Sequence, residues 1–112
     1  MSNINFNTNN VSDPGNGGAI PVGNYNLCCM MTSAAPGETR TLADPTYVGQ
    51  TAVLCHDTDG GAIAVTAASI VNQAANTVMT FSHVDDVVFL SAVTKAGALR
   101  WQVVGEDGIA FS

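Results

Sequence analysis

Alternation of apolar and polar residues within short segments is the feature that most constrains the fold of this chain. In residues 24–31, Tyr, Leu, Cys and Met at the odd positions alternate with Asn, Asn, Cys and Met at the even ones. A period of two is typical of a β-strand with one buried face. Comparable segments follow at residues 40–43, 51–56, 62–66, 77–81, 86–93, 98–104 and 109–111. Turns rich in Gly, Asp, Asn and Pro separate them, so the sequence predicts an all-β fold, either a small antiparallel β-sandwich or a jelly-roll-like barrel.

Two connections between these segments bear on how the strands are joined. Residues 57–61 read Asp-Thr-Asp-Gly-Gly, and their glycines can supply the positive φ that a tight reversal needs. The connection from Ala67 to Asn76 is different, because Ile70, Val71 and the alanines at 74 and 75 would lie on one side of a helix. A single helical turn there is the alternative to an irregular loop.

The first nineteen residues differ in composition from the rest, and we expect an extended N-terminal arm at residues 1–19 and a β-sandwich body at residues 20–112. The arm is rich in Asn and ends in the turn-forming run 12–18, Ser-Asp-Pro-Gly-Asn-Gly-Gly. Its only sizeable internal apolar side chains are Ile4, Phe6 and Val11. An extended arm of this length could reach on the order of 60 Å. It is either an ordinary disordered terminus or an arm that orders on a partner surface.

Charged residues are scarce and mostly acidic. They make up 11% of the 112 residues, with 9 acidic against 3 basic side chains and a net charge of −6. Proteins that bind nucleic acid use a surplus of cations against the phosphates, so we expect no nucleic-acid partner. Hydrophobic residues make up 46%, enough for a packed core. The surface must then be covered by small polar residues or be partly hidden by other subunits.

Targeting and redox signals also narrow the setting. The first ten residues have neither the basic nor the apolar region of a secretory signal. The uncharged stretch from Gly60 to Ser82 is interrupted by polar residues, so we expect β-structure there and no membrane partner. Cys28, Cys29 and Cys55 are odd in number, which argues against a complete disulfide framework. We expect them to be apolar thiols, with the adjacent pair on opposite faces of a strand.

Two short groups come nearest to a catalytic or metal site, His56-Asp57-Thr58-Asp59 and His83-Val84-Asp85-Asp86. Each lies at a turn, where Asp is common because it tolerates turn geometry. No paired Cys-x-x-Cys, His-Glu-x-x-His or calcium loop is present, and the Gly-rich run at 15–18 lacks the Lys-Ser/Thr of a phosphate loop. We expect no catalytic residue, no metal and no cofactor, although a Ser-His-Asp arrangement formed only in the fold stays open. The chain is therefore not predicted to be an enzyme.

Trp101 is the single tryptophan and lies in the segment 98–104. It shares a face with Leu99 and Val103, whereas Arg100 lies on the opposite face. The alternation predicts a core position for the indole, with its N–H hydrogen-bonded near a sheet edge. A role in stacking against a sugar is the alternative.

Turn and core residues from about position 42 to position 108 follow an order that resembles a known group of proteins. The order reads Asp44-Pro45, Gly49-Gln50, Gly60-Gly61, then residues 63–67, 76–81, 86–90 and 92–93, and finally Gly97-Ala-Leu-Arg-Trp-Gln-Val-Val-Gly-Glu-Asp-Gly108. It resembles a small β-rich module of tailed bacteriophage virions, found in capsid decoration (cement) proteins and in fibre or spike segments. The match covers over half of the chain and concerns a fold and a setting, not a catalytic site.

The resemblance implies a structural role in the virion. We expect a capsid cement protein that binds and reinforces the lattice of the major capsid protein, on the capsid exterior, after assembly in the host cytoplasm. A homotrimer is the expected oligomer. The arm lies outside the matched residues, and from its own sequence we expect Ile4, Phe6 and Val11 to be the capsid contacts. The alternative is a tail fibre, spike or baseplate segment that binds the host surface.

Overall fold

A computed structural model of the protein describes residues 8–112. In this part of the chain 54% of the residues are in strands and none is in a helix, so the expected all-β class is confirmed. No helix long and apolar enough to cross a membrane occurs among these residues.

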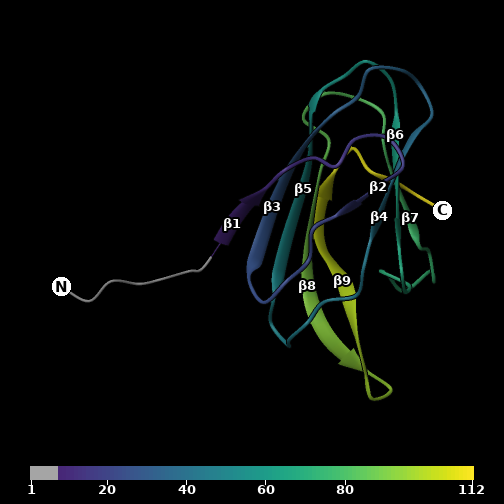
Figure 1. Cartoon of the computed structure of the whole chain (residues 1–112). Coiled ribbons are helices and arrows are strands. Elements are labelled where there is room, and N and C mark those ends of the chain that lie inside the picture. Colours follow the sequence, from purple (N-terminus) through teal and green to yellow (C-terminus); the bar gives the residue numbers. More distant parts are fainter. Residues whose placement is uncertain (1–7) are drawn as a thin grey trace.

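Ten strands form two five-stranded sheets that pack face to face (Figure 1). Sheet A contains, in spatial order, β1 (Thr8–Val11), β3 (Asn26–Thr32), β5 (Thr51–Thr58), β8 (Val87–Lys95) and β9 (Ala98–Asp107). Sheet B contains β10 (Ala110–Phe111), β7 (Val78–Phe81), β6 (Ile63–Ala67), β4 (Glu38–Leu42) and β2 (Gly18–Ile20).

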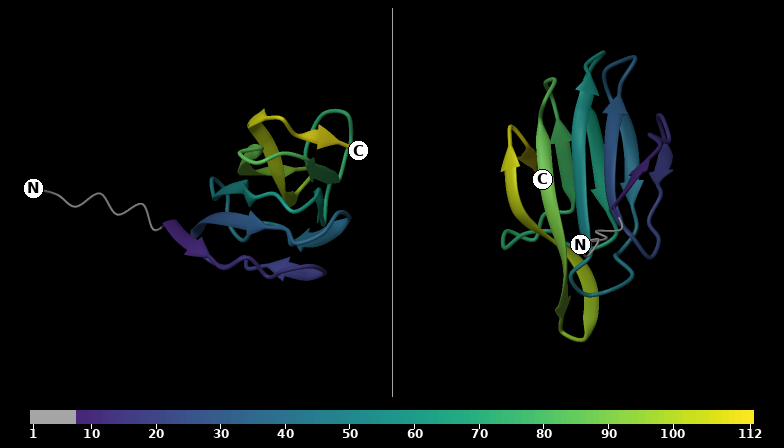
Figure 2. Two further views of the ribbon diagram at one scale, coloured as in Figure 1. Left: turned by 90° about the horizontal axis from the view of Figure 1, so that it is seen from above. Right: turned by 90° about the vertical axis from the view of Figure 1, so that its left-hand side faces the viewer.

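The first six strands wind alternately between the two sheets. β1, β3 and β5 lie in sheet A, and β2, β4 and β6 lie in sheet B. Neighbouring strands within each of these two sets are parallel. The two views of Figure 2 show these successive coils stacked beside one another. The last four strands pair antiparallel, β8 with β5 and β9 in sheet A, and β7 with β6 and β10 in sheet B.

The strand pairing therefore differs from the antiparallel arrangement that was expected. The two packed sheets are present, but each is mixed. Alternation reports which side chains face the core, and it is the same whether a neighbouring strand is parallel or antiparallel. The turn at 57–61 shows the consequence, because it carries the chain from β5 in sheet A to β6 in sheet B, and these two strands do not pair.

Two other connections are clear in the structure. The connection 68–77 contains no helical turn. Instead, Val71 is buried and Asn72 closes the loop by accepting a hydrogen bond from the Asn76 N–H at 3.0 Å. Ala96 and Gly97 form the turn between β8 and β9, both with positive φ, as that hairpin requires.

Two segments of the expected arm 1–19 belong to the sheets of the folded body. Residues 8–11 are β1, which pairs with β3, and residues 18–20 are β2, which pairs with β4. Backbone pairing to a neighbouring strand needs few apolar side chains, which is why an Asn-rich segment can join the body. Residues 1–7 lie outside the described part of the chain.

The core lies between the sheets and is built from the inward-facing residue of each alternating pair. Large fully buried side chains include Leu27, Leu54, Phe81, Leu90 and Trp101. The Trp101 indole N–H donates to the carbonyl of Ala43 at 2.8 Å, so the expected core position and hydrogen bond are both confirmed. Since the indole is 1% exposed, it has no free face for stacking against a sugar.

Candidate interaction surface

Polar side chains inside the sandwich form structural clusters, and the first of these is centred on Arg40 of β4. Its guanidinium is fully buried and binds Asp13 through two bonds, Nε to Oδ1 at 2.7 Å and Nη2 to Oδ2 at 3.1 Å. Nη1 also donates to Glu38 Oε1 at 3.1 Å, and Nη2 to the carbonyl of Thr32 at 3.1 Å. The β1–β2 connection is thereby tied to the second coil of the chain.

Charge pairing in this cluster shifts three pKa values. Burial opposes ionisation of Asp13, but hydrogen bonds from Arg40 and from the N–H groups of Thr32 and Gly15 outweigh it and lower its pKa. Hydrogen bonds from the Ala34 N–H, and from Arg40, lower the pKa of Glu38. The hydrogen bond to Asp13 raises the pKa of Arg40. All three groups are therefore held in their charged forms.

A second cluster joins His56, Ser33 and Asp59 where two inter-sheet turns meet. His56 Nε2 lies 3.1 Å from Ser33 Oγ and 3.8 Å from Asp59 Oδ1. Ser33 Oγ donates to the carbonyl of Gly61 at 2.5 Å and accepts from the Gly60 N–H at 3.0 Å. These contacts lock the β3–β4 turn against the β5–β6 turn.

This cluster has the residue types of a catalytic triad but not its geometry. In a triad the acid binds the imidazole nitrogen opposite the serine. Here Ser33 and Asp59 both lie near Nε2, and His56 Nδ1 is buried without a partner. Ser33 already donates its proton to a carbonyl, so Nε2 must be the donor toward Oγ and cannot act as a base for it. Ser33 is also 3% exposed, which leaves no access for a substrate.

The remaining titratable groups do not converge on a site. Among residues 8–112 no three His, Cys, Asp or Glu side chains are grouped so that they could hold a metal ion. Asp86 accepts hydrogen bonds from the N–H groups of Ser82 and His83, both at 2.9 Å, and so closes the turn before β8. The His83 ring is largely exposed, 4.0 Å from Asp86.

The outer face of sheet A carries the most unusual surface of the described chain. Strand register places Cys28, Val53 and Phe89 side by side in one row across β3, β5 and β8. The adjacent row is Met30, Cys55 and Val87. We call these six residues the sheet A patch. Met30 and Phe89 are 46% and 48% exposed, and the other four are half-buried.

The corresponding face of sheet B is different in chemistry. Its outward positions are mostly small or hydroxylated residues, Ala19, Thr39, Thr41, Ala64, Thr66 and Thr80, with Val78 as an exception. An outer sheet face in water is expected to be polar. Sheet B meets this expectation and sheet A does not, so sheet A is the face that is expected to be covered by another surface.

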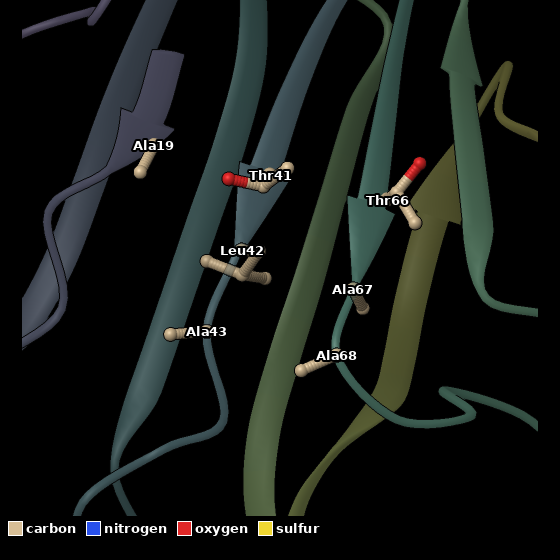
Figure 3. A pocket seen from close by; sticks show the side chains of 7 residues that line it. All are labelled: Ala19, Thr41, Leu42, Ala43, Thr66, Ala67 and Ala68. Atoms are coloured by element: carbon tan, nitrogen blue, oxygen red, sulfur yellow. The ribbon is translucent and has the colours of Figure 1, made fainter. Parts of the chain in front are cut away.

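A hollow of about 300 Å³ lies on sheet B, at the ends of β2, β4 and β6 (Figure 3). Thr41 and Thr66 project from adjacent strands at one side, and Ala19, Ala43 and Ala68 form other parts of its wall. None of its lining residues carries a charge or a nucleophilic thiol, so the hollow has no group suited to acid–base or metal chemistry.

Cys28 and Cys29 lie on opposite faces of β3, as the alternation predicted. Cys29 is fully buried, and burial followed by the nearby Asp13 carboxylate raises its pKa to about 11. Cys28 and Cys55 lie half-buried on the patch as free thiols. Burial raises the pKa of Cys55, and the carboxylates of Asp85 and Asp57 raise it further.

Of the three expected capsid contacts, Val11 lies among the described residues. Val11 is half-buried on β1 and packs against the core, because it pairs with the inward-facing Cys29. Val11 therefore belongs to the folded body, and its role as a capsid contact stays a prediction. Ile4 and Phe6 lie outside the described residues.

The sheet A patch was not found from the sequence, although a signal for it exists. In Cys28-Cys-Met-Met31 and in Val87-Val-Phe-Leu90 the residues on both faces are apolar, so the alternation breaks down. A strand of this kind has two faces to bury, and the second face needs a partner outside the sandwich.

Comparison with known proteins adds no family to this description. No protein-family model matches the chain, and no curated protein matches it.

Proposed function

We propose that this protein is a structural component of a virion, a capsid cement protein that binds and reinforces the lattice of the major capsid protein as a homotrimer. The observation that carries the proposal is the sheet A patch, an apolar surface three strands wide. Contiguous apolar surface of this kind is typical of a protein–protein interface.

The internal chemistry of the body is consistent with a passive role. The Arg40 and His56 clusters are buried and join successive turns of the chain, so both act on stability. The scarcity of charged side chains also suits a protein whose surface is partly covered by other subunits. Closed symmetric oligomers are the common form of such assemblies.

The alternative, a fibre or spike segment that binds the host surface, has less support. A binder of carbohydrate is expected to present exposed aromatic rings. Trp101 is buried, and the Tyr47 hydroxyl is engaged with Asn26 Oδ1 at 2.9 Å. Phe89 is the one aromatic among the exposed large apolar residues of the described chain.

Copy number in the particle tests this proposal. Quantitative mass spectrometry of purified virions that contain the protein is expected to give a number of copies comparable to that of the major capsid protein. A number in the range of a few to a few dozen per particle would instead indicate a tail component. Absence from the virion would overturn the proposal altogether.

A further inference from the structure

We propose that the outer face of sheet A binds the same face of a second copy of this chain across a two-fold axis, with Arg100 of each copy paired to Asp107 of the other. The contact goes beyond the proposed function because it forms in the free protein and needs no capsid subunit. It is additional to the three-fold contact of the proposed homotrimer. In the virion, a capsid subunit replaces the second copy on this face.

The two ends of the outer face of sheet A carry opposite charges. Lys95 and Arg100 lie at the β8–β9 hairpin, and the third basic residue of the chain is the buried Arg40. Asp57 and Asp107 lie at the other end, where β5 and β9 finish, and both are exposed. The face is therefore basic at one end, apolar over the sheet A patch and acidic at the other end.

Arg100 and Asp107 point to the same side of β9. Arg100 pairs with Val93 and Asp107 with Val87, and both valines have the outward parity of Phe89. Along β8 these two pairs are six residues apart, which is about 20 Å of extended strand. Because this distance exceeds the Debye length of about 8 Å at physiological ionic strength, the two groups do not neutralise each other within one molecule.

Arg100 has an incomplete set of partners in its own molecule. Its side chain is half-buried, Nη2 donates to Gln102 Oε1 at 2.8 Å, and Nε is buried without a hydrogen bond. Among residues 8–112, neither Arg100 nor Asp107 takes part in an ion pair. Guanidinium groups are especially suited to binding a carboxylate across an interface. A carboxylate from another molecule is therefore the partner that Arg100 lacks.

The position of the charges selects one arrangement of the two copies. A two-fold axis that runs across the strands reverses their direction and lays β9 of one copy over β9 of the other. The basic end then meets the acidic end twice. An axis along the strands would instead lay β9 over β1 and β3, whose residues carry no charge. In the first arrangement Phe89 lies beside the axis, because its row falls between those of Val87 and Val93.

The size of the face is sufficient for a stable contact between two copies. The right-hand view of Figure 2 looks onto this face. Five strands about 4.8 Å apart, the second longest of nine residues at about 3.3 Å each, give an area of at most about 700 Å². Two copies would bury about 1,400 Å², which lies within the range of about 1,200–2,000 Å² for specific interfaces. A second copy thus matches the face in both charge and area.

Exchange of charges between two variants tests the contact in purified full-length protein, so its failure leaves the proposed function standing. Light scattering over a dilution series gives the number of copies, which we expect to be even. Arg100→Glu and Asp107→Arg each place like charges across the axis. Each is expected to weaken association at least about a hundredfold and to halve the mass. An equal mixture of the two variants is expected to restore association, because one chain then brings two carboxylates and the other two cations.

Matched variants identify the surface. Asp44→Arg makes the same change of charge as Asp107→Arg on an exposed loop after β4 and is expected to leave the mass unchanged. Phe89→Ser is expected to weaken association, whereas Val48→Ser, an exposed residue in the loop before β5, is expected to have no effect. Reaction with a maleimide reports the fold of each variant, since the buried Cys29 stays unreactive in the folded chain.

Three results would overturn the proposal. The first is an odd number of copies at all concentrations, as a monomer or a trimer that binds only a capsid subunit would show. The second is an even number of copies that is unchanged in Asp107→Arg, whose exposed position makes unfolding of the variant unexpected. The third is a mixture of folded Arg100→Glu and Asp107→Arg chains that does not associate. If Arg100→Glu does not fold, Asp107→Arg and Asp44→Arg together still decide the outcome.

Discussion

Arg40 and Asp13 form a bidentate ion pair across 27 positions of sequence, with Nε 2.7 Å from Oδ1. The guanidinium is fully buried between the sheets, and Asp13 Oδ2 also accepts the Thr32 N–H at 2.9 Å. This pair holds the first inter-sheet connection against the second coil. It explains why an Asn-rich N-terminal segment with little apolar surface belongs to the folded body.

Replacing Arg40 by Met is expected to lower the free energy of unfolding by about 3–5 kcal/mol, because two carboxylates would be left without their buried partner. Urea unfolding followed by the fluorescence of Trp101 measures the change. Lys95→Met removes an exposed cation at the end of β8 and is the matched control, with an expected change within about 0.5 kcal/mol. Equal effects of the two substitutions would show that the buried ion pair does not stabilise the fold.

Acid is expected to destabilise the protein through the same cluster. The pKa values of Asp13 and Glu38 are lowered in the folded state from ordinary values of 3.8 and 4.5. Their contribution to stability is therefore fully present above pH 4.5 and is lost as the pH falls through the lowered folded-state values. Thermal unfolding between pH 7 and pH 2 is expected to show this loss, and Asp13→Asn is expected to show a shallower one. An identical pH dependence in the variant would rule out Asp13 as a cause.

The close approach of two successive turns disfavours any side chain at position 61. A Cβ at this position would overlap backbone atoms of Pro36 and Ala35 in the β3–β4 turn, and φ is +150°. Gly97 also has positive φ, at +80°, but a Cβ there meets nothing within 4 Å. Gly61→Ala is expected to cost about 1–3 kcal/mol more than Gly97→Ala, a difference that chemical denaturation resolves. Similar costs would mean that the two turns are not in contact.

Trp101→Phe is expected to cost about 1–3 kcal/mol, because the Ala43 carbonyl loses the hydrogen bond from the indole and the core loses volume. Tyr47→Phe removes a part-exposed hydroxyl from Asn26 and is expected to cost less. Thermal unfolding by circular dichroism measures both. In the unmodified protein, iodide is expected not to quench Trp101, and efficient quenching would contradict its buried position.

The positions of the strands could be predicted from sequence, but their partners could not. The segments expected at 51–56, 77–81 and 98–104 lie within or around β5, β7 and β9. The alternation of apolar and polar residues does not reveal that the chain winds between two sheets, because every inward residue meets the same core whichever sheet it belongs to. The turn at 57–61 illustrates this limit, since its glycines suit a hairpin as well as a crossing between sheets.

Side-chain clusters formed by long-range contacts could not be predicted from the sequence either. Arg40 was expected in the short segment 40–43, and its partner Asp13 in an arm outside the body. Ser33 and His56 meet only because two turns stack. The division of Cys28 from Cys29 was predictable, because it depends on one strand alone.

Burial of Met30 and Phe89 in the assembled particle is the most direct test of the account. A reconstruction of virions carrying this protein, at a resolution that shows side chains, measures it. We expect both side chains to be enclosed by an adjacent subunit on the outer face of sheet A. Density that shows the protein in place with Met30 and Phe89 facing solvent would contradict the assignment of this face as the assembly surface.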